Sequence, residues 1–132
     1  MNQKLHVLLI EDDADDVELL QDAFVTKGIV HTMHVINDGG LVTSYLHANK
    51  EYPDIIVMDL NLPKVHGKEI LKEIKSVPVY DKIPVVILTT SSSPEDKKYT
   101  LSLGADDYLI KPTTTIGLYN VVSVITKIAA HV

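Results

Sequence analysis

The sequence contains neither cysteine nor arginine among its 132 residues. Without cysteine, the chain has no disulfide framework and no thiolate metal site. Arginine is the preferred residue for paired contacts to guanine and to phosphate, so its absence argues against a nucleic-acid partner. The net charge of −6 argues in the same direction, because an acidic surface is repelled by nucleic-acid phosphates.

Long apolar segments are also missing. No run approaches the roughly 20 residues that a membrane-spanning helix needs, and residues 1–4 lack the apolar core of a signal peptide. We therefore expect a cytoplasmic protein that does not associate with membranes. The length and the apolar share of 45% predict a single domain over residues 1–132, with no output domain attached.

Short β-rich runs alternate with amphipathic segments along the chain. This alternation predicts βαβ units, and hence an α/β fold built on a parallel sheet. The expected strands cover residues 5–10, 32–36, 55–59, 83–88 and 106–110, and the expected helices cover residues 14–27, 39–49, 65–76, 94–103 and 114–129.

Polar residues stand where four of the expected strands end. They are Glu11-Asp12-Asp13, Asp59, Thr89-Thr90 and Lys111. In a parallel sheet these ends meet at one edge, which is where open α/β sheets carry their chemistry. Carboxylates packed together repel one another and need a cation, and hard oxygen ligands without His or Cys favour Mg²⁺. A magnesium ion with open positions for phosphate oxygens is suited to phosphoryl transfer.

With these residues in order, the chain resembles the response regulator receiver domain of two-component signalling. The resemblance implies a doubly wound (βα)5 flavodoxin-like fold with five parallel strands and flanking helices. It spans Lys4 to about Lys127 and rests on Glu11-Asp12, Asp59-Leu60-Asn61-Leu62-Pro63 with Gly67, Leu88-Thr89-Thr90, and Tyr108-Leu109-Ile110-Lys111-Pro112. The local style is most similar to stand-alone regulators that pair with phytochrome-type histidine kinases.

The resemblance assigns the phosphoacceptor and the metal ligands. Asp59 would accept a phosphoryl group from a kinase phosphohistidine and form an acyl phosphate. Asp12 would bind Mg²⁺ directly, Glu11 would act mainly through water, and Asn61 would contribute its backbone carbonyl. Asp13 lies one residue further on and is expected to cap the first helix. In the family, side chains at Asn61 and near Ser91 influence how long the phosphoryl group survives.

The resemblance also implies a switch. Thr89 would donate a hydrogen bond to a phosphoryl oxygen and Lys111 would pair with another, while Tyr108 would turn inward when Thr89 moves. The Lys111–Pro112 bond is a candidate cis peptide, since cis bonds belong to X-Pro. Gly67 is expected to adopt a backbone conformation that other residues resist. His66, where the family often has Asp, is interpreted as a surface histidine.

Three other functions share parts of this pattern. A haloacid-type phosphatase also uses a strand-end Asp with magnesium, but it needs a second Asp where this chain has Asn61. A flavodoxin-like flavin carrier needs a loop rich in Ser, Thr and Gly after the first strand, where Glu11-Asp12-Asp13 would repel phosphate. A degenerate receiver used only for binding would be expected to lack Asp59, Lys111 or Thr89.

The last expected helix has two unlike faces. One stripe should face the core and comprises Leu118, Val121, Val122, Ile125 and Ala129. The opposite side carries a single charge and comprises Ile116, Tyr119, Asn120, Ser123, Val124 and Lys127. This side, together with the fifth strand, is a candidate surface for a homodimer or for a downstream protein target. We expect a phosphorelay switch with only weak self-phosphatase activity; the sequence specifies neither its kinase nor its target.

Overall fold

Parallel strands form a five-stranded sheet within residues 4–49 and 51–130, which are the residues that the computed structural model describes. The order across the sheet is β2-β1-β3-β4-β5. The strands are β1 (Leu5–Ile10), β2 (His31–Ile36), β3 (Ile55–Met58), β4 (Val85–Thr89) and β5 (Asp107–Ile110). Because the order reverses direction after β1, the carboxyl ends of β1 and β3 flank the crevice in which open α/β sheets hold their sites.

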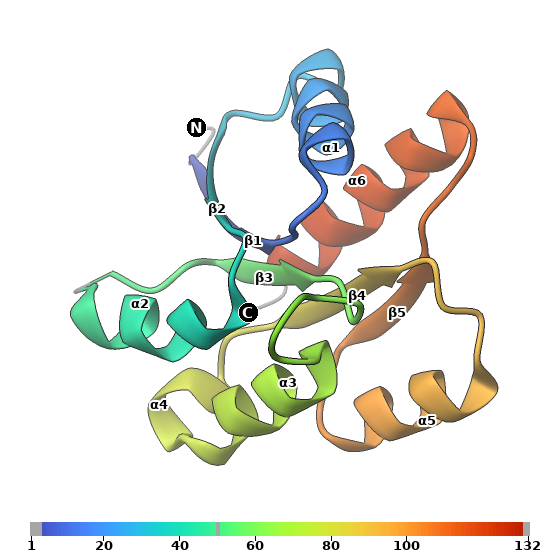
Figure 1. Ribbon diagram of the computed structural model, residues 1–132. Coiled ribbons are helices and arrows are strands. Elements are labelled where there is room, and N and C mark those ends of the chain that lie inside the picture. The colour runs from blue at the N-terminus through green and yellow to red at the C-terminus, as the bar shows by residue number, and fades with distance from the viewer. Residues whose placement is uncertain (1–3, 50, 131–132) are drawn as a thin grey trace.

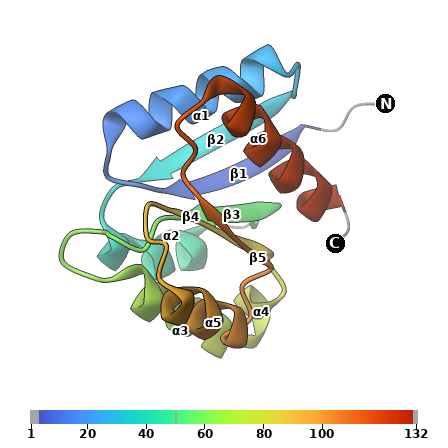
Figure 2. The same cartoon turned by 90° about the vertical axis from the view of Figure 1, so that its right-hand side faces the viewer.

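Helices cover both faces of the sheet (Figures 1 and 2). Helices α1 (Ala14–Thr26) and α6 (Thr115–Ala130) lie on one face and contact each other. The other face carries α2 (Val42–Ala48), α3 (Gly67–Ser76), α4 (Pro78–Asp81) and α5 (Pro94–Ser102), with a short 3-10 turn, η1 (Gly39–Leu41), before α2. None of the helices in the described ranges has the length and hydropathy that crossing a membrane requires.

The buried strands divide their side chains between two apolar cores. Leu8 and Ile10 of β1 point to the α2–α5 side, whereas Val7 and Leu9 point to the α1–α6 side. Strands β3 and β4 alternate in the same way, and their residues from Ile55 to Met58 and from Val85 to Thr89 are all buried. Continuous apolar runs are what a parallel sheet covered on both faces requires. Because both faces of each strand are packed, the residues that follow the strands, including Glu11 and Asp59, are held at fixed positions at the carboxyl ends.

The expected fold class, strands and five longer helices are confirmed, with boundaries shifted by no more than three residues. The sequence pattern missed α4, because four residues are too few to show a helical period. Pro78 occupies the first helical position of α4, where a missing backbone N–H costs nothing. The segment expected as one helix over residues 39–49 begins as the 3-10 turn and continues as α2.

The predicted core stripe of α6 is confirmed. Val121, Val122 and Ile125 are buried, and Leu118 and Ala129 pack against the same core. One assignment on the opposite side is corrected, since Tyr119 also packs partly against this core. Its large ring reaches back to apolar neighbours that its backbone position does not face. Ile116 remains 73% exposed and is the strongest apolar feature of the outer face.

Candidate functional site

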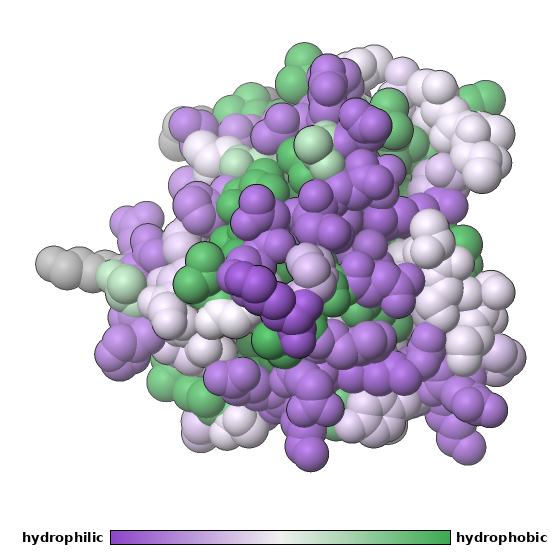
Figure 3. All heavy atoms as spheres, viewed as in Figure 1, coloured by the Kyte–Doolittle hydropathy of each residue, from purple (hydrophilic) through white to green (hydrophobic). Residues whose placement is uncertain are grey.

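An acidic group lies at the carboxyl ends of β1 and β3. Each of Glu11, Asp12 and Asp59 offers a carboxylate oxygen, and these oxygens lie within 4.8 Å of one another. Glu11 and Asp59 are buried, whereas Asp12 is exposed. Hydrophilic residues cover much of the surface seen in Figure 3, and hydrophobic ones show there only in small separate spots. The sheet therefore brings together the acidic residues that the strand ends predicted.

Asp13 is separated from this group by its role in α1. Its carboxylate accepts hydrogen bonds from the backbone N–H groups of Asp15 and Asp16, at 2.9 and 3.2 Å. These bonds satisfy donors that the first turn of a helix leaves without partners. The cap fixes the register of the three consecutive acids and leaves Glu11 and Asp12 for the site.

Asp59 is held in its ionised form. Burial pushes the pKa of its carboxyl upward, but hydrogen bonds from Lys111, Thr89 and the Asn61 backbone outweigh burial, so this pKa lies below its usual value. The Lys111 ammonium is 2.8 Å from Asp59 Oδ2, and the Asn61 N–H is 3.2 Å from Asp59 Oδ1. An ionised, nearly buried carboxylate with fixed donors has the properties of a poised nucleophile.

Glu11 differs from Asp59 in the direction of its pKa shift. Burial is the largest influence on it and raises the pKa of the Glu11 carboxyl, although Lys111 opposes that shift from 2.6 Å. The negative charge of Asp59 adds to the increase. Like charges at close range favour the neutral form of one partner, so a bound cation would stabilise the ionised forms of both carboxylates.

Lys111 also contacts a residue that sequence reasoning did not assign to the site. Its Nζ lies 2.6 Å from Asp16 Oδ2, on the first turn of α1. Burial opposes the charge of Lys111, but the carboxylates of Asp16, Asp59 and Glu11 more than offset it and raise the pKa of the ammonium. The available signal in the sequence was the closeness of Asp16 to the end of β1.

Gly67 corrects an expectation about backbone conformation. Its φ angle does not lie in the left-handed region, which within the described residues is occupied by Lys64, Gly28 and Gly104. The reason for glycine is close approach: a Cβ atom on Gly67 would stand 2.5 Å from the Asp59 carbonyl oxygen and 2.7 Å from Leu60 Cα. The start of α3 therefore packs directly against the backbone that carries Asp59.

Thr89 and Tyr108 lie on the neighbouring strands β4 and β5, and both are buried. The Thr89 side chain is fully buried and hydrogen-bonds to Asp59. The Tyr108 ring is also buried, and its hydroxyl donates to the Ser91 carbonyl oxygen at 2.8 Å. Tyr108 is thus in an inward position in this structure. Its ring packs with the α2–α5 core, as a wholly solvated tyrosine would not.

Ser91 connects this region to a polar link between two helices. Its hydroxyl donates to Asp96 at 2.6 Å, and Asp96 forms an ion pair with Lys68 of α3. Lys68 lies over the Tyr99 ring, with 5.6 Å between its Nζ and the ring centroid. The Ser91 side chain is therefore directed toward α5, and its hydroxyl is engaged there.

Pro112 and His66 both lie close to the site. The described residues contain no cis peptide bond, so the expectation of a cis Lys111–Pro112 bond is wrong; the ammonium reaches its partners with this bond in the trans form. His66 is exposed, and its Nδ1 accepts from the Lys68 N–H at 3.1 Å. Its observed part is to cap α3, as a side-chain acceptor at a helix start does.

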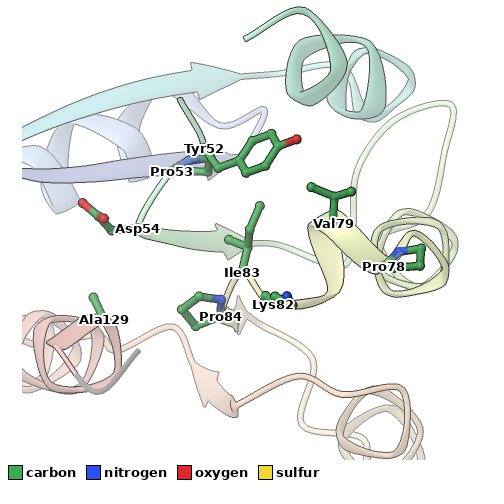
Figure 4. A pocket seen from close by; sticks show the side chains of 9 residues that line it. All are labelled: Tyr52, Pro53, Asp54, Pro78, Val79, Lys82, Ile83, Pro84 and Ala129. Carbon is green, nitrogen blue, oxygen red and sulfur yellow. The ribbon is translucent and has the colours of Figure 1, made fainter. Parts of the chain in front are cut away.

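A hollow lies at the opposite end of the sheet. It measures about 530 Å³ and is shown in Figure 4; its lining comprises Tyr52, Pro53, Asp54, Pro78, Val79, Lys82, Ile83, Pro84 and Ala129. Prolines and aliphatic side chains dominate this lining, and the Asp54 carboxylate already accepts from the His6 N–H at 2.8 Å. The hollow lacks the convergent polar groups of a reactive site.

Carboxylate oxygens, with no histidine or cysteine, form the acidic group and suit a hard divalent cation. Burial first, and then the charge of Asp59, raise the pKa of Glu11, and a cation beside both carboxylates would favour their ionised forms. Both observations fit Mg²⁺ or Mn²⁺ and do not fit a soft metal.

Comparison with known proteins agrees with this geometry. The family of response regulator receiver domains matches residues 7–123. The chain is 37% identical over 121 residues to response regulator Rcp1 of Synechocystis sp. (strain ATCC 27184 / PCC 6803 / Kazusa), covering 88% of this chain and 82% of that protein.

Two solved structures are similar over most of their length. One is the phosphorylated cyanobacterial phytochrome response regulator RcpA, with a TM-score of 0.87 and 34% identity over 97% of this chain and 95% of that one. The other is the Mn²⁺-bound form of Rcp1, with a TM-score of 0.81 and 36% identity over 93% and 92%. Together with the fold and the site, these matches establish that the chain belongs to the response regulator receiver domain family of two-component signalling.

Proposed function

We propose that this protein is a phosphorelay switch in which Asp59 accepts a phosphoryl group from the phosphohistidine of a histidine kinase. The observation that carries the proposal is the ionised Asp59 at the end of β3, in contact with Lys111 and beside the carboxylates of Glu11 and Asp12. A nucleophile, a cation for the incoming phosphate and a metal-binding group are the parts that phosphoryl transfer requires.

The transfer is a single displacement at phosphorus. An Asp59 carboxylate oxygen forms the new P–O bond as the P–N bond to the kinase imidazole breaks. The electron pair of that bond stays on the imidazole nitrogen, which then takes a proton. Hydrolysis of the acyl phosphate later returns the Asp59 carboxylate and inorganic phosphate, and this weak self-phosphatase reaction is the only other chemistry we propose.

Glu11, Asp12, Asp59 and the backbone carbonyl of Asn61 would hold Mg²⁺. When bound, the ion neutralises charge on the carboxylates and on the phosphoryl oxygens. The chain's own groups position the rest: Lys111 pairs with one phosphoryl oxygen and Thr89 donates its hydroxyl to another. Both side chains already contact Asp59, which supports these roles.

Magnesium titration tests the ligand assignment. Asp12→Ala should weaken Mg²⁺ binding more than Glu11→Ala does, because Asp12 is exposed toward solvent and is proposed as the direct ligand. Asp13→Ala is the control, since that carboxylate caps α1. If Asp13→Ala has the largest effect, the assignment of these neighbouring acids is off by one residue.

Phosphotransfer from purified histidine kinases and radiolabelled ATP tests the proposed function. Label should move from the kinase to this protein in the presence of Mg²⁺ and should be absent from Asp59→Asn. Kinases of the phytochrome type are the first to try, because the chain is similar to phytochrome response regulators. Equal labelling of the parent and Asp59→Asn would contradict the assignment.

Phosphorylation is proposed to act through Thr89 and Tyr108. The buried Tyr108 and its bond to Ser91 support an inward state that a phosphoryl group bound to Thr89 would stabilise. Beryllofluoride, a phosphoryl mimic, should shift backbone amide signals over residues 89–111 in NMR spectra. A response confined to residues 59–67 would contradict this switch.

The output surface is proposed to comprise α5, β5 and α6, where a second copy or a downstream protein docks. Support comes from exposed apolar side chains on each element: Tyr99 and Leu101 on α5, Ile110 on β5 and Ile116 on α6. Light scattering over a concentration series should show self-association that beryllofluoride strengthens and Ile116→Glu abolishes. Val25→Glu, at a site 68% exposed on α1, is the matched control. A parent protein that stays monomeric throughout would contradict the homodimer.

A further inference from the structure

Asp16 holds the ammonium of Lys111 from outside the acidic group. The two residues lie 95 positions apart in sequence, yet their Oδ2 and Nζ atoms are 2.6 Å apart. The Lys111 side chain is only 13% exposed and the Asp16 side chain 35% exposed. A contact this short between partly desolvated charges fixes the position of the ammonium more firmly than a surface ion pair would.

Asp16 is independent of the groups that change during phosphoryl transfer. The carboxylates whose oxygens gather within 4.8 Å are those of Glu11, Asp12 and Asp59, and Asp16 is not one of them. Its backbone belongs to α1 and is bound to the Asp13 cap. Of the carboxylates that contact Lys111 in the described residues, Asp16 alone lies on a helix outside the proposed nucleophile and metal ligands.

We propose that Asp16 is a positioning residue for phosphoryl transfer, anchoring Lys111 so that its ammonium is in place for the incoming phosphoryl oxygen. This inference rests on the proposed function of Asp59. An ammonium has three N–H donors, and here they face Glu11, Asp16 and Asp59. When Asp59 becomes an acyl phosphate, its carboxyl oxygen loses its negative charge. The Lys111 N–H that pointed to Asp59 then donates to a phosphoryl oxygen. The bond to Asp16 persists through this exchange.

The anchor matters because a lysine side chain is long and flexible. Its four-carbon stem can adopt many rotamers, and this freedom must be lost before the ammonium can act at one place. A carboxylate on a rigid helix removes much of this freedom before the phosphoryl donor arrives. Loss of the anchor should therefore slow phosphorylation and weaken the binding of a phosphoryl mimic, while Mg²⁺ binding stays the same.

Asp16→Asn is the variant that tests the anchor, and Asp15→Asn is its matched control. Both residues lie in the first turn of α1, so both variants remove the same charge from the same helix start. Within the described part of the chain, Asp15 forms no ion pair with Lys111. Two quantities are measured: the rate of phosphorylation by acetyl phosphate, by intact mass spectrometry, and the affinity for beryllofluoride, by NMR titration.

We expect Asp16→Asn to lower both quantities about tenfold, as the loss of about 1.4 kcal/mol would. Mg²⁺ affinity of the unphosphorylated protein should be unchanged, and Asp15→Asn should match the parent. In a Lys111→Ala background, Asp16→Asn should have no further effect, because the group that it anchors is absent.

Four results would overturn the anchor. They are an Asp16→Asn variant equal to the parent, one that is faster than the parent, equal losses in Asp15→Asn and Asp16→Asn, and an undiminished effect without Lys111. The last two would mean a general charge effect. Failure of the parent itself to accept phosphate would contradict the proposed function, and the inference with it; a labelled parent with an ineffective Asp16→Asn contradicts the inference alone.

Discussion

Two aspartates flank β3, and only one of them lies in a reactive environment. Asp54 precedes the strand, is exposed and accepts a hydrogen bond from the His6 N–H. Asp59 follows the strand, is 6% exposed and contacts Lys111 at 2.8 Å. Both residues are aspartates at an end of the same strand, so residue type and strand cannot explain why Asp59 and not Asp54 has the environment of a nucleophile. The difference comes from the partners that other strand ends supply, which are carboxylates, a hydroxyl and an ammonium at one edge of the sheet.

The two edges also differ in packing. At the carboxyl edge Gly67 touches the Asp59 backbone so closely that a single added carbon would collide with it. At the amino edge a hollow of about 530 Å³ lies between α4, α6 and the starts of β3 and β4 (Figure 4). A tightly packed edge can hold charged groups at fixed distances, and an open one cannot.

The largest expected effect separates the two aspartates. With acetyl phosphate and Mg²⁺, the parent protein should gain one phosphate, and Asp59→Asn should gain none because the attacking oxygen is missing. Asp54→Asn should be labelled like the parent. Intact mass spectrometry measures all three. Labelling of Asp59→Asn, or loss of labelling in a folded Asp54→Asn, would contradict the conclusion that only the aspartate after β3 accepts phosphate.

The packing contrast predicts the next effect. Gly67→Ala should destabilise the protein by roughly 2–3 kcal/mol, because its new Cβ atom meets backbone at 2.5 and 2.7 Å. Val79→Met, which adds a longer side chain at an exposed position in the lining of the hollow, should change stability by less than about 0.5 kcal/mol. Urea unfolding measures both. Equal losses would mean that the two edges are equally packed.

A smaller effect concerns pH at the carboxyl edge. The pKa of Glu11 is raised in the folded protein by burial, so the folded state binds a proton more tightly than the unfolded state does. The contribution of Glu11 to the free energy of unfolding is fully present at pH values below its usual pKa of 4.5. It is lost as the pH rises through the raised pKa of the folded state. Glu11→Gln should remove this loss, so that the stability of the metal-free protein falls less between pH 4 and pH 8 than that of the parent. Thermal melts from pH 4 to 8 without metal check it; an unchanged pH profile would contradict it.

The smallest effect lies at the helix link outside the acidic group. Lys68 first, and then Ser91, lower the pKa of the Asp96 carboxyl. Its stabilising contribution is therefore present above the usual value of 3.8 and is lost as pH falls through the lowered value. Asp96→Asn should cost about 0.5 kcal/mol at pH 7, in the range of a solvent-accessible ion pair. Urea unfolding at pH 7 and pH 3 measures it; the same cost at both pH values would exclude a charge effect.

The sequence by itself determined the elements of the site that follow from local patterns. Apolar runs ending at Ile10, Met58 and Leu88 predicted buried parallel strands, and their ends predicted which polar residues would meet. The register of the three consecutive acids also followed locally, because Asp13 caps α1 through its nearest neighbours. Strand periodicity and helix caps depend on neighbouring residues alone, so they can be read without knowing the fold.

Only the tertiary structure decided which side chains contact Lys111 and how closely the helices approach the sheet. The contact of Lys111 with Asp16 depends on where the start of α1 lies relative to the end of β5, and no local pattern records that placement. The same holds for Gly67, whose role is contact with the Asp59 backbone and not a left-handed turn. Distances between segments far apart in sequence are set by the packing of both cores at once, so a pattern over a few residues cannot contain them.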